Sequence, residues 1–263
     1  MTAQQPGVPD RLVQALQELA ATDRLLVALD FDGTLAPEVD DPARARALPE
    51  AREAVLRLLA LPATRVALVS GRALGSLEEV SQLPDEALLV GSHGVEIRLD
   101  PEEDAVQLDA EEREKVGVLE DVLKGIARGI DNVWIEDKPA GFALHTRLAT
   151  ERHSRVAHVV ALSEARAEVE GVTVREGKNV LEFSVRSTTK GEAVQHLRRY
   201  TGATAVLYAG DDVTDEDAFA VLGEGDLGLK SGEGTTAASY RVRGPEQVAR
   251  ALSMLAGFRG AAG

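Results

Sequence analysis

The chain has no cysteine among its 263 residues, and only 3% of its residues are aromatic. Without cysteine there are no disulfides, thiolate metal sites or thiol catalysis, and without many aromatics the core must consist mostly of Ala, Val and Leu. No apolar run approaches the length that spans a membrane. Residues 1–10 also lack the hydrophobic region of a signal peptide, so we expect a cytoplasmic protein.

Positive charge is scarce as well. The chain has 29 Lys and Arg against 44 Asp and Glu, which gives a net charge of 29 − 44 = −15. This balance disfavours nucleic acid and anionic membranes as partners, and an anionic ligand would need a local positive site. The apolar content of 44% supports a real core, and the length suffices for one large or two modest domains.

Two acids follow the apolar run 25–28 at alternate positions, Asp30 and Asp32. In an extended strand, side chains two residues apart face the same way, so both carboxylates can share one small volume. Two negative charges at such a short separation repel each other unless a cation or a proton compensates them. Gly33 permits a sharp turn after the strand. This stretch therefore favours a metal or proton-transfer role, with solvated acids at a turn as the alternative.

Apolar runs alternate with helical patterns along most of the chain. Strands are expected at 25–28, 65–69, 87–90, 205–209 and 227–229, with a further segment at 95–98, and helices at 11–21, from 49, at 190–200 and at 247–255. This alternation predicts an α/β fold, with a parallel sheet covered by helices on both faces. Such sheets bind ligands at the carboxyl ends of their strands, where Asp30, Ser70 and Asp211 fall.

Residues 99–114 are dense in acids and are interpreted as a linker into an inserted domain. The insertion is expected at 109–186, in the order helix, strand, strand, helix, strand, strand. Residues 1–108 and 187–263 then form the core domain. Within the last inserted strand, the alternation sends Leu181 and Phe183 to one face and Glu182 to the other.

Two helix starts carry polar groups suited to an anion. Ser70, Gly71 and Arg72 offer a hydroxyl and backbone N–H groups at the beginning of a helix. Lys190 begins another helix, where the helix dipole disfavours a cation, so a compensating anion is expected beside it. That helix is predicted to turn Tyr200 inward, together with Ala193, Val194 and Leu197.

Asp211, Asp212 and Asp215 follow the strand at 205–209. Carboxylate oxygens are the ligands that Mg²⁺ prefers, so one acid from this turn can join Asp30 at a metal. For Asp215, an equal alternative is that its carboxylate caps the helix that follows.

Taken in chain order, the string Asp30-Phe31-Asp32-Gly33-Thr34, the string 70–72, Lys190 and the string 210–212 resemble the four motifs of the haloacid dehalogenase (HAD)-like phosphatases. The resemblance implies a HAD-like Rossmannoid core with an inserted α/β cap of the C2B type. It implies Asp30 as the nucleophile and Asp32 as the general acid/base. The implied phosphate ligands are Ser70, Gly71 and Lys190, and the implied Mg²⁺ ligands are Asp30, Asp32, Asp211, Asp212 and Asp215.

Longer strings resemble the trehalose-6-phosphate phosphatases within that superfamily. They are residues 91–96, 136–138, 143–147, 177–182, 190–193 and 210–217. The resemblance implies Mg²⁺-dependent hydrolysis of trehalose 6-phosphate to trehalose and phosphate through an aspartyl phosphate, the last step of trehalose biosynthesis. It implies substrate contacts at Arg72, His93, Glu136, Lys138, Lys178 and Glu182, and for His93 a structural turn role is equally open.

Two other readings of the sequence stay open. Another sugar-phosphate phosphatase or a phosphosugar mutase would share the core chemistry and differ in the cap. A non-catalytic sugar-phosphate sensor would not need Asp32, which serves turnover rather than binding. The expected partner is a small sugar phosphate, with no nucleic acid and no membrane, and the expected state is a monomer.

Overall fold

The computed structural model describes residues 8–99, 108–177 and 179–262. These residues divide into two compact units. The first unit lies within Met1–Asp104 and Thr189–Gly263, and the second within Ala105–Thr188. The insertion expected at 109–186 falls inside the second unit. Among the described residues, no helix combines the length and apolar character needed to cross a membrane.

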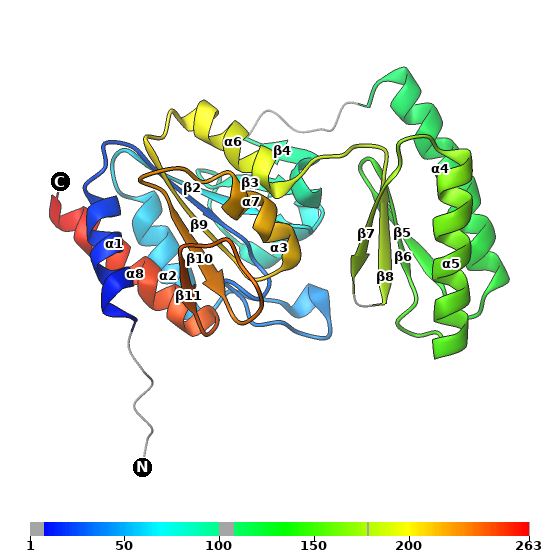
Figure 1. Cartoon of the computed structure of the whole chain (residues 1–263), viewed down its shortest axis with the longest axis horizontal. Helices are drawn as coiled ribbons and strands as arrows, with labels where there is room; N and C mark the ends of the chain where they lie inside the picture. The colour runs from blue at the N-terminus through cyan, green and yellow to red at the C-terminus, as the bar shows by residue number, and fades with distance from the viewer. Residues whose placement is uncertain (1–7, 100–107, 178, 263) are drawn as a thin grey trace, which may run out of the picture. The chain divides into compact units, whose positions relative to one another are not determined.

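A seven-stranded sheet in the order β11-β10-β9-β1-β2-β3-β4 organises the first unit (Figure 1). Its strands are β1 (Leu25–Leu29), β2 (Thr64–Val69), β3 (Leu88–Gly91), β4 (Glu96–Arg98), β9 (Ala205–Gly210), β10 (Leu227–Ser231) and β11 (Tyr240–Val242). Every neighbouring pair is parallel except β3 and β4. The predicted parallel sheet is thus confirmed, with one antiparallel edge strand; β11 was not predicted.

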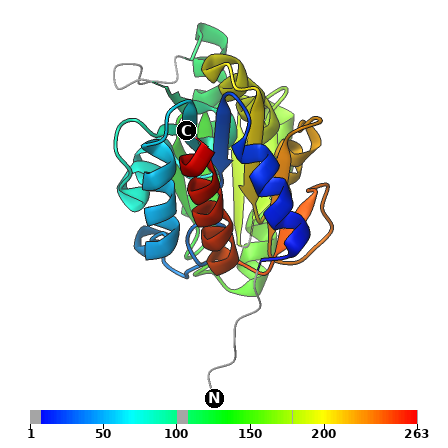
Figure 2. The same ribbon diagram turned by 90° about the vertical axis from the view of Figure 1, so that its left-hand side faces the viewer.

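Helices cover both faces of this sheet. They are α1 (Asp10–Ala20), α2 (Pro49–Leu59), α3 (Leu74–Ser81), α6 (Lys190–Thr201), α7 (Glu216–Ala220) and α8 (Pro245–Ala262), with short 3₁₀ turns η1 (Pro42–Arg44), η2 (Ser92–Gly94) and η3 (Val213–Asp215). Figure 2 shows α2, α8 and α1 side by side over one face. The helix predicted at 247–255 is longer at both ends, as α8 shows.

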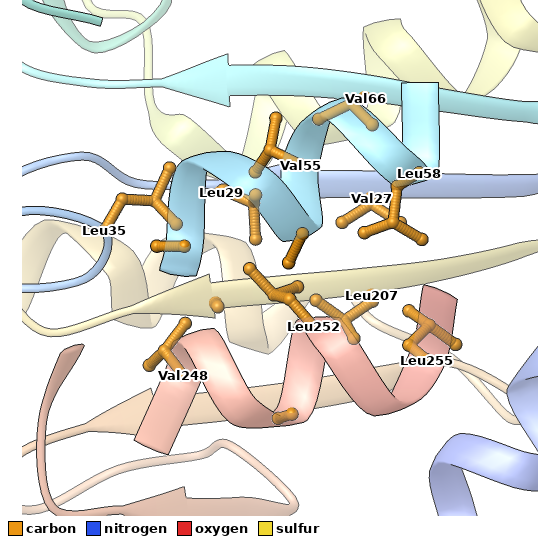
Figure 3. Packing of buried hydrophobic residues seen from close by; sticks show 14 of the residues in the cluster. Val27, Leu29, Leu35, Val55, Leu58, Val66, Leu207, Val248, Leu252 and Leu255 are labelled. Atoms are coloured by element: carbon orange, nitrogen blue, oxygen red, sulfur yellow. The ribbon is translucent and has the colours of Figure 1, made fainter. Parts of the chain in front are cut away.

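The strands supply both core clusters because their side chains alternate. Val27 and Leu29 of β1 point into the cluster formed with α1, α2, α3 and α8, where Val55 of α2 and Leu252 of α8 lie over the sheet (Figure 3). Leu26 and Ala28, which alternate with them along β1, point into the cluster formed with α6 and α7. Since both faces of β1 are buried, its sequence is continuously apolar.

Helix α6 begins where it was predicted, but the burial predicted for its last turn is wrong. Thr189 and Glu192 form a capping box, and Ala193 and Leu197 are buried as predicted. Tyr200, predicted to face inward, is 41% exposed. It lines a pocket with Arg24 and Leu25, at the end of the sheet where β1 begins.

The second unit has the predicted order of elements. A four-stranded antiparallel sheet, β5-β6-β8-β7, has α4 and α5 against one face (Figure 1). The elements are α4 (Ala110–Gly129), β5 (Trp134–Lys138), β6 (Gly141–His145), α5 (Glu151–Glu168), β7 (Thr173–Gly177) and β8 (Val180–Ser184). Leu181 and Phe183 pack under the helices, as their alternation predicts.

The linker predicted at 99–114 is wrong at its C-terminal end. Helix α4 begins at Ala110, because Asp109 and Glu112 form a capping box there. The acids of this stretch suit the positive end of the helix dipole rather than an irregular linker. The central part of the expected linker, 100–107, lies outside the described residues.

A buried arginine attaches α8 to the sheet edge opposite the strand ends that carry the acids. The guanidinium of Arg259 donates to Thr64 Oγ1 at 2.6 Å and to the carbonyls of Ala20, Thr22 and Ala63 at 3.0, 2.8 and 2.8 Å. Burial lowers the pKa of Arg259 from its ordinary value. These acceptors are neutral, so the hydrogen bonds themselves must offset the cost of burying the charge.

Replacing Arg259 with Met should lower the free energy of unfolding by about 3 kcal/mol, because several buried carbonyls lose their charged donor. Urea denaturation followed by circular dichroism measures this change. The exposed Arg11 of α1 provides the control, since Arg11→Met should change stability by less than about 0.5 kcal/mol. Equal midpoints for both variants would show that Arg259 contributes nothing.

Candidate active site

Three parallel neighbours in the sheet, β9, β1 and β2, end beside one another. Asp211 follows β9, Asp30 follows β1 and Ser70 follows β2. Parallel strands bring their carboxyl ends to the same edge, so side chains separated by up to 181 positions in the chain become neighbours there. The predicted clustering of these three loops therefore follows from the strand order.

Lys190 is the central cation of this edge. Its Nζ donates to Asp30 Oδ1 at 2.8 Å and to Asp215 Oδ1 at 2.7 Å, and all three side chains are buried. The compensating anion expected beside this helix-starting lysine is thus supplied by two carboxylates of the protein itself.

Burial and charge act in opposite directions within this group. Burial would lower the pKa of Lys190, but Asp30 and Asp215 outweigh it and raise the pKa above its ordinary value. Burial raises the pKa of Asp30 well above its usual range, and the charge of Asp215 adds to the effect against the opposing charge of Lys190. Asp30 is therefore a desolvated carboxyl group beside a firmly protonated amine.

Asp215 is fully committed to contacts within the protein. Its Oδ1 accepts from Lys190 and from the Tyr208 hydroxyl, the latter at 2.6 Å. Its Oδ2 accepts from the backbone N–H groups of Asp211 and Asp212 at 2.9 and 2.8 Å. The Asp215 side chain makes no capping hydrogen bond to α7, the helix that follows, and it binds the turn that precedes η3 instead. Its role as a metal ligand stays a prediction.

Asp211 lies against the turn that follows Asp30. A Cβ atom at Gly33, whose φ is +74°, would overlap the Asp211 carboxylate, so only glycine fits there. Burial, and next the charge of Asp215, raise the pKa of Asp211 to about 7. Asp30, Asp211 and Asp215 each offer a carboxylate oxygen within 4.8 Å of one another. Asp212, also predicted as a ligand, is outside this group and exposed.

Asp32 is paired with an arginine. Arg72 Nε and one terminal nitrogen of Arg72 donate to its two carboxylate oxygens at 2.5 and 2.7 Å. The guanidinium also lies 5.9 Å from the centre of the Phe31 ring and donates to Ser76 Oγ at 3.3 Å. Arg72, predicted as a substrate contact, is thus directed in this structure at the predicted acid/base.

The loop after β2 is held by the turn at η2. His93 N–H donates to the Ser70 carbonyl, and the His93 ring occupies the space beside Gly71, where a Cβ would lie 2.6 Å from ring atoms. Ser92 N–H donates to the Arg72 carbonyl at 2.7 Å. Through these contacts His93 supports the loop that is predicted to bind phosphate. Its contact with substrate stays a prediction.

Several supporting residues were not predicted. Lys230 is buried in β10 and donates to the Asp211 and Asp212 carbonyls, and Ser231 donates to the Gly33 carbonyl. Tyr208 is buried beneath Asp215. The available signal was a charged residue in an otherwise apolar strand, in a chain with only six lysines.

The second unit carries its own polar group on the face of the sheet opposite the helices. Glu136 pairs with Lys138 Nζ at 2.8 Å and lies 2.8 Å from His145 Nε2. The hydrogen bond with His145, and next the contact with Lys138, lower the pKa of Glu136 to about 2. Trp134 stacks on His145 at 5.0 Å. Trp134 and His145 were not predicted, although Trp134 precedes Glu136 by two positions on the same strand face.

Strand register relates Glu136 to the other predicted acid of this unit. Glu136 pairs with Ala143 of β6, and Ala143 pairs with Glu182 of β8, so the two acids share one face across a small residue. The structure thus brings Glu136, Lys138 and Glu182 to the same face. Lys178 lies outside the described residues.

Comparison with known proteins supplies the family. The trehalose-phosphatase family model matches residues 28–246. A trehalose-phosphate phosphatase of Mycobacterium ulcerans is 33% identical over 93% of the chain and 66% of its own length. A bifunctional trehalose-6-phosphate synthase/phosphatase of Thermoproteus tenax is 35% identical over 86% of the chain, but only 31% of its own length is covered.

A solved structure agrees in fold. The C-terminal domain of the trehalose-6-phosphate phosphatase of C. albicans superposes with a TM-score of 0.76 at 24% identity, covering 98% of this chain and 99% of that one. The family model covers the core loops at Asp30, Ser70, Lys190 and Asp211 together with the inserted unit. The chain therefore belongs to the trehalose-phosphatase family.

Proposed function

We propose that this protein hydrolyses trehalose 6-phosphate to trehalose and inorganic phosphate. The observation that carries the proposal is the buried contact of Lys190 with Asp30, beside the Asp211 carboxylate. It supplies a carboxylate nucleophile, a cation for the phosphoryl group and acids for a metal ion in one place. Family membership and the names of the relatives favour trehalose 6-phosphate as the substrate, in the last step of trehalose synthesis.

Mg²⁺ fits the donor set of this site. The cluster of Asp30, Asp211 and Asp215 presents carboxylate oxygens alone, which suit a hard divalent cation. Asp30 and Asp211 would hold the ion, aided by the main-chain carbonyl of Asp32, since Asp215 already accepts four hydrogen bonds. The bound ion would neutralise charge on the phosphoryl oxygens.

The reaction proceeds in two displacements. A carboxylate oxygen of Asp30 attacks phosphorus while Asp32 gives its proton to the departing sugar oxygen, leaving an aspartyl phosphate and free sugar. Asp32 then takes a proton from water, whose oxygen attacks phosphorus and restores Asp30. Lys190 offsets the repulsion between the carboxylate and the phosphate, and Ser70 and Gly71 donate to the phosphate oxygens.

The inserted unit would bind the sugar. Glu136, Lys138 and Glu182 offer charged acceptors and donors on one sheet face, which suits the hydroxyls of a disaccharide. With its position fixed by Lys138 and His145, Glu136 is held ready to accept hydrogen bonds. Three other functions would give different products from sugar phosphates. Another sugar-phosphate phosphatase would release phosphate from a different sugar, a mutase would move the phosphate within the sugar, and a sensor would release no phosphate.

The decisive experiment is phosphate release with Mg²⁺ across phosphorylated mono- and disaccharides. Trehalose 6-phosphate should give the highest kcat/KM, and Asp30→Asn should lower kcat on the order of a thousandfold or more, since the nucleophile is lost. Asp85→Asn, an exposed acid on the same unit, should retain activity. No phosphate release from any compound would favour the sensor, and isomerised sugar phosphate would identify a mutase.

A second prediction concerns Arg72, which orients Asp32. Arg72→Met should lower kcat/KM for a sugar phosphate about a hundredfold, because its alkoxide leaving group needs a proton from Asp32. The kcat/KM of the same variant for p-nitrophenyl phosphate, which reports the first displacement, should stay near that of wild type, since p-nitrophenolate leaves without a proton. Arg72→Lys, which keeps the charge but not the paired hydrogen bonds, should lie between the two.

The matched control is Arg98→Met, which removes another buried arginine, one paired with Glu78 at 2.6 Å. It should leave the ratio of the two kcat/KM values unchanged. An equal loss with both substrates in Arg72→Met would instead assign Arg72 to binding the phosphoryl group.

A third prediction concerns pH. With its pKa raised to about 7, Asp211 holds a proton below neutral pH in the metal-free protein and must lose it to bind Mg²⁺. The affinity for Mg²⁺ should therefore rise between pH 6 and pH 8, by up to about tenfold per unit below the pKa. Titration calorimetry in buffers of different ionisation enthalpy should detect proton release at pH 6. An affinity that does not change with pH would contradict this assignment.

A further inference from the structure

The end of β10 lies next to the acidic turn. In the register of the sheet, Lys230 of β10 pairs with Gly210, the last residue of β9 before Asp211. Lys230 is 3% exposed although it is a lysine. Its Nζ donates to the Asp211 carbonyl at 2.6 Å and to the Asp212 carbonyl at 3.2 Å, and it lies 3.4 Å from Glu216 Oε1.

Two of the three N–H donors of the ammonium group serve these carbonyls, and the contact with Glu216 is an ion pair rather than a hydrogen bond. One buried cation binds two successive carbonyls and so fixes the path of the backbone from which the Asp211 side chain projects. The carboxylate of Glu216 balances its charge, as a buried lysine requires. Lys230 therefore acts on the turn as a tether and not as a substrate ligand.

The next residue holds the other acidic loop. Ser231, also buried, donates from its hydroxyl to the Gly33 carbonyl at 2.7 Å. Gly33 follows Asp32 in the loop after β1, and β1 is separated from β10 by β9. Consecutive side chains of a strand point to opposite sides, so β10 can reach two different loops with adjacent residues.

The two tethered loops are in contact with each other. The space beside Gly33 is filled by the Asp211 carboxylate, so the separation of the loops sets where this carboxylate lies relative to Asp30. A shift of either loop would change the spacing of the carboxylate oxygens that now lie within 4.8 Å.

We propose that Lys230 and Ser231 are positioning residues that hold the loops of Asp30 and Asp211 at the spacing a divalent cation needs. This inference rests on the Mg²⁺ site of the proposed function. Neither side chain would itself be a ligand of the ion, since both donate to backbone carbonyls. Their effect is exerted through three carbonyls, in the manner of the outer residues that orient ligands at many metal sites.

The test is direct titration of the metal-free protein with Mg²⁺ by calorimetry, supported by Mn²⁺ binding followed by electron paramagnetic resonance. Lys230→Met should weaken Mg²⁺ binding about tenfold, and Ser231→Ala by about threefold. Lys230→Gln, which keeps a donor for one carbonyl, should bind with intermediate affinity. These readouts do not depend on turnover.

Thermal unfolding with and without Mg²⁺ separates positioning from general stability. Arg98→Met, with a buried cation removed elsewhere in the same unit, should lower the Tm and leave the Mg²⁺ affinity unchanged. Ser231→Ala removes one hydroxyl and should remain folded even if Lys230→Met does not. If the folded Lys230 and Ser231 variants bind Mg²⁺ within twofold of wild type, the positioning role is wrong and the metal site stands. If the wild-type protein binds no Mg²⁺, the proposed metal site and the positioning role are both wrong.

Discussion

The buried contact of Lys190 with Asp30 and Asp215 is the interaction on which this unit depends. An ammonium group and two carboxylates are removed from water together, and each is stable there only because the others are present. The three residues come from the start of α6, the end of β1 and the turn after β9. One charge balance therefore joins segments that the sequence places up to 185 positions apart.

This balance also divides the acids into two kinds. Asp215 accepts from Lys190, from Tyr208 and from two backbone N–H groups, so its charge is used within the protein. Asp211 lies in the same cluster, and burial with the charge of Asp215 raises its pKa to about 7. Two acids of the same cluster thus differ in what they can bind. Asp215 maintains the turn, whereas an external cation would stabilise the charged form of Asp211, or a proton would remove its charge.

Local patterns in the sequence predicted the parallel sheet, both helical layers and the loops that bear Asp30, Ser70 and Asp211. These features depend on strand polarity and on residues close together in the chain. The pairing of Arg72 with Asp32 bridges 40 positions, and the contact of Lys230 with the Asp211 carbonyl bridges 19. A backbone carbonyl carries no sequence signal, so a residue that acts through one cannot be found by a motif.

The inserted unit meets a different constraint, because its charged face lacks the burial that surrounds Lys190. There Glu136 keeps its charge through Lys138 and His145, while about half of its side chain remains exposed. Strands in a sheet lie about 4.8 Å apart, so Glu136 and Glu182 on either side of Ala143 stand roughly 10 Å from each other. Ala143 between them is 1% exposed, so the polar side chains on either side of it, rather than its methyl group, form the exposed part of this face.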